Sequence, residues 1–215
     1  MLAISGQRKP ERIRGDLYNA LIAGDEVAPG DLLIGLYQKG SSVVELGDDL
    51  PGPVFRGLGE DWDRGDAAVR EERRCCEIAT TVLHELRRWI PDPPPAAPLA
   101  LAATPGKALA EVPIRLVELV LKAHGWRTHM AGCGLPVSEI KEAIARHTPR
   151  LVCISAIHLE DTEEYIGLNT RLLDGSDQPV VVGGGAFTAD QTVRLSCQQF
   201  ASNFNALARW LEQHG

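Results

Sequence analysis

The hydrophobic pattern changes character once along the chain. Up to residue 91, apolar residues recur at helical spacing and glycines follow the ends of the periodic segments. The clearest apolar stripe consists of Val69, Cys76, Ala79, Val82, Leu83, Leu86 and Ile90. We predict four helices, over residues 16–23, 31–37, 54–62 and about 67–89. Helices with one apolar face each form a small bundle.

A proline-rich segment, Pro91-Asp-Pro-Pro-Pro-Ala-Ala-Pro98, separates this part from the rest and is typical of a stiff linker. Beyond it, predicted strands alternate with predicted helices. The strands fall at 99–103, 126–131, 151–158, 179–182 and 198–201, and the helices at 112–124, 138–147, 161–175, from 188 and 203–212. The alternation predicts an α/β fold with a doubly wound parallel sheet of flavodoxin-like, Rossmann-type order. The expected domains are a helical bundle at 1–91, a linker at 92–98 and the α/β domain at 99–215.

The apolar run from Leu151 to His158 predicts the central buried strand of this sheet. Ligands of open parallel sheets bind outside the carboxyl ends of the strands, so Ser155, Ala156 and His158 stand where a ligand would lie. The next predicted strand runs straight into Gly183, Gly184 and Gly185, which carry no Cβ to keep a bulky ligand away. The sequence therefore predicts a ligand site at these two neighbouring strand ends.

Net charge, cysteine content and the lengths of the apolar stretches argue against several classes of function. The 215-residue chain has a formal net charge of -7, which argues against direct binding to a phosphate backbone. Its five cysteines are odd in number and form no C-x-x-C pair, as expected of reduced thiols in the cytoplasm. Cys75 and Cys76 are adjacent and could form a redox switch, but this interpretation is the less favoured one. No apolar stretch reaches the ~20 residues of a membrane span, and no secretory signal is recognisable.

The residues of the α/β part carry a family resemblance. They resemble the cobalamin-binding domains of methionine synthase, of methyltransferase corrinoid proteins and of the light-sensing CarH regulators. In that family a serine after the third strand and a double glycine after the fourth contact the nucleotide tail of the cofactor. Ser155 and Gly183-Gly184 occupy those places here. Gly125-Trp126, and Gly132 with Leu135-Pro136, match the start and the end of the family's second strand.

The helical part resembles the cap that covers the corrin ring in such proteins. Leu58-Gly-Glu-Asp-Trp62, Gly65 and Glu71-Glu72 look like the cap signature L-G-x-x-W-x-x-G and its W-x9-E-H element. The resemblance implies that Trp62 and Glu72 contact the cofactor from above. It also implies a helical cap followed by an α/β domain of the cobalamin-binding type.

One family motif is missing. The first loop of these domains carries D-x-H-x-x-G, whose histidine binds cobalt from below. That position falls on Ala110, or on Leu109 after a shift of one residue, and the motif's glycine falls on Pro113. Arg73 replaces the histidine of the cap element. A corrinoid held by this chain would not be ligated as in methionine synthase, which weakens methyl-transfer and adenosyl-radical readings.

A helical cap and a cobalamin-type domain without the loop histidine are similar to the AerR/PpaA antirepressors of photosynthetic bacteria. A related domain, that of AppA, is described as holding heme in place of cobalamin. The resemblance implies a cytoplasmic, non-catalytic photoreceptor or redox sensor that binds cobalamin, as hydroxocobalamin, or alternatively heme. Its expected partner is a CrtJ/PpsR-type repressor of photosystem genes. Two alternatives stay open: a corrinoid carrier of a methyltransferase system, and a scaffold that has lost its cofactor.

A neutral imidazole is the expected protein ligand of the cofactor metal. His158 is the first candidate because it follows the central strand, and His129 on the second strand comes next. For each, the alternative is a structural histidine bonded to neighbouring backbone. His84 is a weaker candidate, and Lys107 in the first loop reads as a solvated surface residue. The three other histidines, at helix ends, are given no role.

Overall fold

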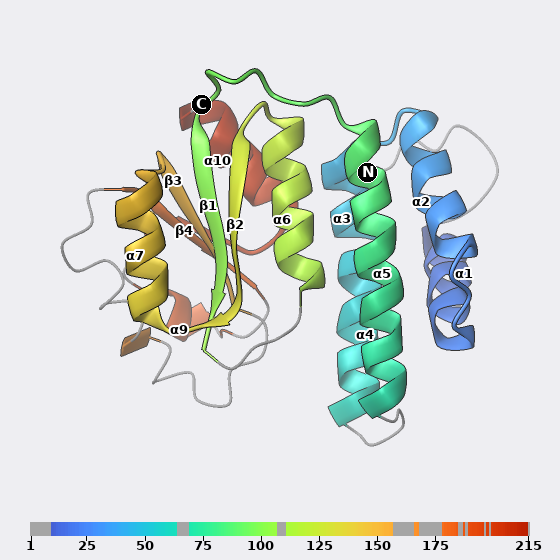
Figure 1. Cartoon of the computed structure of the whole chain (residues 1–215). Coiled ribbons are helices and arrows are strands. Elements are labelled where there is room, and N and C mark those ends of the chain that lie inside the picture. Colours follow the sequence, from blue (N-terminus) through green and yellow to red (C-terminus); the bar gives the residue numbers. More distant parts are fainter. Residues whose placement is uncertain are drawn as a thin grey trace. The chain divides into compact units, whose positions relative to one another are not determined.

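The computed structural model describes residues 10–63, 69–106, 111–156, 166–167, 178–184, 187, 189–195, 197 and 199–214, with the side chains of 59–63, 69 and 189 excepted. The chain divides into two compact units, Met1–Pro91 and Asp92–Gly215. The first is helical and the second is a sheet with helices (Figure 1). Within the described residues, no helix combines the length and the apolar character needed to cross a membrane.

The described residues of the helical unit form one helix more than the periodicity predicted. Its described helices are α1 (Pro10–Ala23), α2 (Ala28–Gln38), α3 (Val43–Asp49), α4 (Pro51–Asp63) and α5 (Val69–Trp89). The sequence pattern missed α3 because seven residues are too few to display a helical period. A capping box marks its start: the Ser42 hydroxyl accepts from the Glu45 N–H at 3.1 Å, and the Glu45 carboxylate accepts from the Ser42 N–H at 2.9 Å.

Leucines of α1 and α2 meet the apolar stripe of α5 in the core of this unit. Leu17, Leu21, Leu33, Val82 and Leu86 are each no more than 3% exposed. The end of α1 is also bound to α5, because the Arg74 guanidinium donates to the Gly24 carbonyl at 3.0 Å. A cation at this place compensates the unpaired carbonyls of a helix end. The predicted apolar face of α5 is thus the face that holds the bundle together.

The α/β unit has the predicted topology. Its described elements are β1 (Leu99–Pro105), α6 (Val112–Ala123), β2 (Arg127–Leu135), α7 (Val137–His147), β3 (Leu151–Ser155), β4 (Val180–Gly183), α9 (Ala189–Thr192), β5 (Gln199–Ala201) and α10 (Phe204–His214). The described strands pair in parallel in the order β2-β1-β3-β4-β5. The doubly wound, flavodoxin-like α/β fold is confirmed. The predicted helix over 161–175 lies outside the described residues, apart from one helical segment at 166–167.

Alternation along the strands assigns residues to the two faces of the sheet. One face packs on Ile140 and Ile144 of α7 and consists of Leu101, Ala103, Val152, Ile154, Val180 and Val182. Residues that alternate with these, such as Ala102 and Cys153, belong to the face on the side of α6. Figure 1 shows α7 and α6 on opposite sides of the strands. Both faces are therefore covered, which explains the continuous apolar runs in the sequence.

Strand β2 continues further than the predicted end at residue 131. Its pairing with β1 shifts between Ala102 and Ala103 and again between Thr104 and Pro105, which leaves Ala131 and Gly134 as extra residues. Gly132 and Gly134 take φ values of +129° and +69°, which glycine adopts readily. These two bulges let β1 and β2 pair as far as Pro105 and Leu135. Thr104 therefore belongs to a strand, although the sequence placed it in a loop.

The proline-rich segment is fastened to the α/β unit. Lys122 of α6 is 5% exposed, and its Nζ lies 2.6 Å from the Asp92 carboxylate. The Arg127 side chain donates to the Ala97 carbonyl at 3.0 Å, and the Arg127 N–H donates to the Pro98 carbonyl at 2.9 Å. The segment thus begins and ends on fixed contacts and is not a freely moving spacer.

In the α/β unit, the sequence predicts Ser138 and Asn203 as the N-cap residues of their helices, and these two predictions had different outcomes. The Asn203 carboxamide accepts from the Ala206 N–H at 2.8 Å, so the predicted cap of the last helix is confirmed. Ser138 was the wrong cap for α7, which begins at Val137 with Pro136 at the N-cap position. Pro136 fixes its own φ just before the helix, so the helix begins without the side-chain cap expected from the Ser138 hydroxyl.

Candidate functional site

Four small residues lie side by side at the carboxyl edge of the sheet. Thr104 of β1 pairs with Cys133 of β2, and Ser155 of β3 pairs with Gly183 of β4. Thr104 and Ser155 each follow directly on the paired residues Ala103 and Ile154. Because paired residues of parallel strands share a face, these four residues lie on the α6 side. We call Cys133, Thr104, Ser155 and Gly183 the edge row.

The Thr104 hydroxyl marks the edge row as a place where hydrogen-bonding capacity is unused. Thr104 is 0% exposed, and its Oγ1 makes no hydrogen bond of acceptable geometry within the described part of the chain. A buried hydroxyl without a partner costs about 1–3 kcal/mol. Ser155, its neighbour on β3, is 3% exposed. Two hydroxyls at a sheet edge, one of them orphaned, fit a ligand that offers polar groups.

Cys133 completes the row on β2 as a neutral thiol. Burial raises the pKa of Cys133, while a side-chain contact with the Thr104 hydroxyl lowers it, although this contact does not have the geometry of a hydrogen bond. The charge of Glu111 raises this pKa further and that of Arg115 lowers it, so both groups of α6 are within electrostatic reach. A protonated thiol is a small and weakly polar side chain. The row therefore carries little charge of its own.

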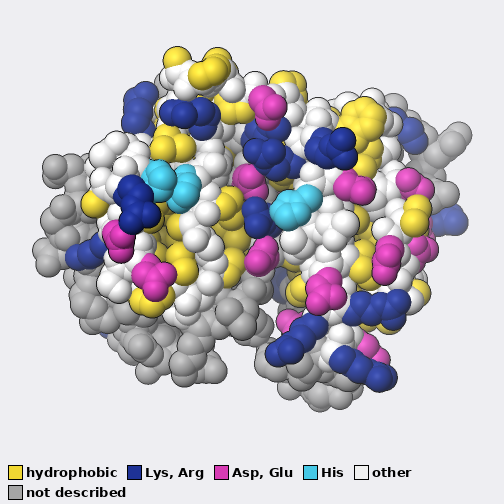
Figure 2. Space-filling view, viewed as in Figure 1, with side chains coloured by type: hydrophobic (Ala, Val, Ile, Leu, Met, Phe, Trp, Pro, Cys, Tyr) yellow, Lys and Arg dark blue, Asp and Glu magenta, His cyan; other side chains and the backbone are white. Residues whose placement is uncertain are grey.

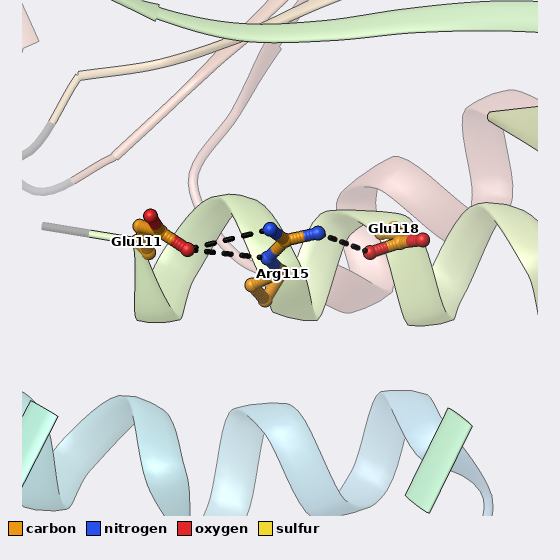
Figure 3. A network of polar contacts seen from close by, with 3 residues as sticks. All are labelled: Glu111, Arg115 and Glu118. Carbon is orange, nitrogen blue, oxygen red and sulfur yellow. Dashed lines mark hydrogen bonds and ion pairs between the residues drawn. The ribbon is translucent and has the colours of Figure 1, made fainter. Parts of the chain in front are cut away.

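The start of α6 is held rigid beside the edge row by an ion-pair network (Figure 3). The Arg115 guanidinium lies 3.3 Å from the Glu111 carboxylate and 3.2 Å from the Glu118 carboxylate. The Glu118 side chain is only 8% exposed, so this part of the network is shielded from solvent. A planar guanidinium between two carboxylates fixes the geometry of both pairs. Ion pairs thus connect the first turns of α6, and Glu111 and Arg115 act electrostatically on Cys133.

The glycines after β4 have a structural reason that the sequence interpretation did not recognise. Gly184 has a φ of +128°, and a Cβ there would lie 1.7 Å from the Ala156 carbonyl oxygen. The Gly183 carbonyl accepts a hydrogen bond from the Ala156 N–H at 2.7 Å, and a Cβ on Gly183 would lie 3.1 Å from the Ala201 carbonyl oxygen. The close approach made possible by these glycines is therefore first of all an approach of backbone to backbone.

The structure brings together several of the residues that the sequence singled out. Ser155, Ala156, Gly183 and Gly184 meet at the adjoining ends of β3 and β4. The Ala156 side chain packs in the core on the α7 side, so it offers a ligand only its backbone. Gly185, His158 and Lys107 lie outside the described residues, as do the loop positions 109 and 110.

His129 lies away from the edge row. It pairs with Leu101, which pairs with Val152, so it stands three residues before the level of Ser155. Three residues correspond to about 10 Å along a strand. The imidazole instead stacks on that of His147, with ring centroids 3.8 Å apart and 27° between the planes. Two adjoining histidine side chains are visible on the surface of the α/β unit in Figure 2.

This stack gives His129 a packing partner that the sequence analysis did not find. Burial of the ring lowers the pKa of His129, and the charge of His147 lowers it further. His147, at the end of α7, had been given no role. A strand residue and a helix-end residue eighteen positions apart show no local pattern that would pair them. The structure therefore does not place His129 together with Ser155 and Gly183.

The candidates of the helical unit lie on α4 and α5. Trp62 belongs to α4, but its side chain lies outside the described part. Glu72 is half-buried on α5, and His84 is exposed further along the same helix. Across the described ranges, no cluster of three or more His, Cys, Asp or Glu side chains could hold a metal ion.

None of the five cysteines, all of which lie among the described residues, forms a disulfide in the structure. Burial raises the pKa of Cys76 to about 11 and that of Cys153 to about 12. The pKa of Cys75 is raised as well, again by burial. Thiols of this kind are mostly protonated and weakly reactive near neutral pH. The adjacent pair on α5 thus has the properties of structural cysteines.

Residues 98–201 match the family model described as the B12 binding domain. The matched segment runs from the residue before β1 to the end of β5 and includes the whole edge row. The α/β unit is thus similar to domains of the B12-binding type, and a helical unit precedes it in this chain.

Solved structures of corrinoid proteins have a similar fold. The monomethylamine corrinoid protein of Methanosarcina barkeri aligns with 96% of this chain and 100% of its own, with a TM-score of 0.77 and 15% identity. The methanol:cobalamin methyltransferase complex MtaBC from Methanosarcina barkeri gives a TM-score of 0.52 at 15% identity, over 100% of this chain and 86% of that chain. At such identities the likeness is one of fold. No curated protein matches the chain.

Proposed function

We propose that the α/β unit binds a cobalamin-type corrinoid along the edge row, and that the protein is a regulator and not an enzyme. The observation that carries the binding proposal is the orphaned Thr104 hydroxyl within a B12-binding-type domain. A corrinoid carries amides and a phosphate around an extended ring, and these groups are suitable partners for the Thr104 and Ser155 hydroxyls.

The protein ligand of the cofactor metal would not come from the loop that supplies it in methionine synthase. No histidine occurs between Thr104 and Glu111, the segment that joins β1 to α6. His158, three residues after Ser155 in the sequence, is the proposed axial ligand. His129 is the second choice, weakened by its stacking on His147. Heme is the alternative cofactor, and imidazole would serve iron equally well.

A corrinoid without the loop ligand suits a sensor better than a methyl carrier. The resemblance to the AerR/PpaA antirepressors supports a protein that binds a CrtJ/PpsR-type repressor of photosystem genes. Light or redox chemistry at the cofactor would change the axial ligand, and the two ligand states would present different surfaces to the partner. Coupling of this kind requires differential contacts in the two states. The net charge of -7 is consistent with action through a protein and not through DNA.

A corrinoid carrier of a methyltransferase system is the second candidate. The fold likeness to the monomethylamine corrinoid protein, over 96% of this chain and 100% of that chain, favours it. The absence of a histidine between Thr104 and Glu111 argues against a carrier that depends on a lower ligand from that loop.

Reconstitution tests the proposal in two stages. The purified chain is incubated with hydroxocobalamin, and separately with heme, and then passed through a desalting column. Retention of hydroxocobalamin with an altered spectrum supports corrinoid binding, retention of heme alone supports the heme alternative, and a colourless protein contradicts both. A His158→Ala variant should lose the spectral change, whereas His129→Gln should keep it.

The second stage separates the sensor from the carrier. The cofactor-loaded protein, in the dark and after illumination, is used to capture a CrtJ/PpsR-type repressor, and methylcobalamin-loaded protein is offered a thiol acceptor. State-dependent capture without methyl transfer supports the regulator. Methyl transfer without capture supports the carrier.

A further inference from the structure

A cavity lies at the edge of the sheet opposite to the edge row, where the strands begin. Its volume is about 480 Å³, and its wall includes Trp126, Arg150 and Gln199, which stand at the starts of β2, β3 and β5. The last turn of α10 closes the other side. Figure 1 shows the C-terminal end of α10 at the end of the sheet where β1 begins. This cavity is separate from the edge row, which lies at the carboxyl ends of the same strands.

The cavity has a rigid aromatic wall. Trp126 and Trp210 both line it and are 3% and 8% exposed, so each indole is largely fixed in the core. The His214 ring stacks on Trp210 with centroids 4.3 Å apart and 11° between the planes. Its Nδ1 lies 2.8 Å from the Trp210 carbonyl oxygen, which holds the imidazole in this orientation. The flat surface that is exposed in the cavity is therefore that of the His214 ring, backed by Trp210, while the two indoles reach the cavity only at their margins.

The mouth of the cavity carries an available positive charge. Arg150 is exposed, and its guanidinium forms no hydrogen bond or ion pair with any described residue. Its backbone is fixed, because the Arg150 N–H donates to the Leu99 carbonyl at 2.8 Å. Gln199 and Gln213 add carboxamides, and no acidic side chain lines the cavity among the described residues. In a chain of net charge -7, a cavity without carboxylates favours an anion.

We propose that this cavity binds a small planar organic anion of the aromatic carboxylate class. A volume of about 480 Å³ lies within the range of small-molecule sites. The carboxylate would pair with the Arg150 fork, and the ring would lie against the aromatic wall. The inference goes beyond the proposed function and does not depend on it, since none of its residues belongs to the edge row.

The chain supplies an internal control for the test. Its four tryptophans are Trp62 and Trp89 on the helical unit and Trp126 and Trp210 at the cavity. In a nitrogen–proton correlation spectrum, each indole N–H gives one signal, and Trp→Phe variants at 62 and 89 assign them. Titration with 2-naphthoate should shift the signals of Trp126 and Trp210 saturably and leave the other two in place. The uncharged 2-naphthalenemethanol should produce much smaller shifts.

Two arginine variants test whether the carboxylate of the ligand binds to Arg150. Arg150→Gln keeps a polar side chain but removes the charge, and it should weaken 2-naphthoate binding about tenfold. Arg209→Gln, an exposed residue on α10 that does not line the cavity, is the matched control and should bind like the wild type. The proposal is overturned if no saturable shift occurs at Trp126 and Trp210, if both variants weaken binding equally, or if the alcohol binds as well as the carboxylate.

Discussion

The two edges of the parallel sheet are built from opposite kinds of residues. At the carboxyl edge the side chains are small, and at Gly184 the backbone passes directly over the Ala156 carbonyl. At the amino edge two tryptophans and Arg150 surround a cavity of about 480 Å³. Five residues of β3 connect one edge with the other. The buried interior is common to both, so the residues just outside the strands decide what each edge can bind.

This comparison shows two ways in which a sheet edge accommodates a ligand. At the carboxyl edge, small residues and an unpaired hydroxyl offer polar contact to a large ring system. At the amino edge, large rigid side chains enclose a space for a small one.

The largest effect is expected from Gly184→Ala. The new Cβ would lie 1.7 Å from the Ala156 carbonyl oxygen, on a backbone with φ of +128°. Because backbone has to move to relieve the contact, we expect a loss on the order of 3–5 kcal/mol in the free energy of unfolding. Urea denaturation of the cofactor-free protein measures it.

Gly106→Ala is the control for the backbone strain alone. Gly106 has φ of +78°, but no atom of the described residues lies within 4 Å of the position of its Cβ. Its expected cost is about 1–2 kcal/mol. Equal losses in the two variants would show that the contact between Gly184 and Ala156 is not tight in solution.

A smaller effect is expected where charge fastens the linker at the amino edge. Asp92→Ala removes the carboxylate that lies 2.6 Å from the buried Lys122 ammonium. Because the Asp92 side chain is 83% exposed, we expect a loss of only about 1 kcal/mol in the free energy of unfolding. Thermal or urea unfolding of the two proteins measures it.

Glu142→Ala is the matched control for this charge effect. It breaks the pair with Arg146, in which both side chains are about two-thirds exposed, and should cost less than about 0.5 kcal/mol. A loss as large as that of Asp92→Ala would mean that burial of Lys122 contributes nothing.

The smallest effect concerns the stacked rings of His129 and His147. The pKa of His129 is lowered from its ordinary 6.5, first by burial and then by His147. As the pH falls below 6.5, the unfolded chain takes up a proton that the folded protein resists, so stability decreases. His129→Gln should flatten this decrease while it changes stability at neutral pH by no more than about 0.5 kcal/mol.

Free energies of unfolding at about pH 7.5 and about pH 5.5 measure the change. His84→Gln, at an exposed position on α5, should leave the pH dependence as it is in the wild type. An unchanged slope in His129→Gln would contradict the assigned cause of the shift.

The sequence was sufficient for the topology because each strand of the α/β unit is an apolar run between helical patterns. The parallel order β2-β1-β3-β4-β5 follows from that alternation. It was not sufficient for the second strand's length, since the extra residues Ala131 and Gly134 interrupt the alternation. It missed α3 because seven residues carry too little periodicity, although its capping box was present in the sequence.

The candidate site was predicted only in part, because the irregular pairing of β1 and β2 cannot be recognised in the sequence. Ser155 and Gly183 end uninterrupted strands, so their place at the edge could be read directly. Thr104 precedes Pro105-Gly106, which looks like a turn, and only the bulged pairing with Cys133 shows that it belongs to the edge row. The burial that orphans its hydroxyl depends on both neighbouring strands and on α6. No local pattern contains that information.

The central claim is that the orphaned hydroxyl of the edge row is a contact for the corrinoid. The most direct test is an absorbance titration with hydroxocobalamin of wild type, Thr104→Val and Thr128→Val. Thr128 on β2 also has a buried hydroxyl without a partner among the described residues, but it lies at the level of Ala100, far from the edge row. Both variants should stabilise the cofactor-free protein by about 1 kcal/mol.

Only Thr104→Val should weaken hydroxocobalamin binding, by about tenfold. Wild-type affinity in Thr104→Val, or the same weakening in Thr128→Val, would contradict the account.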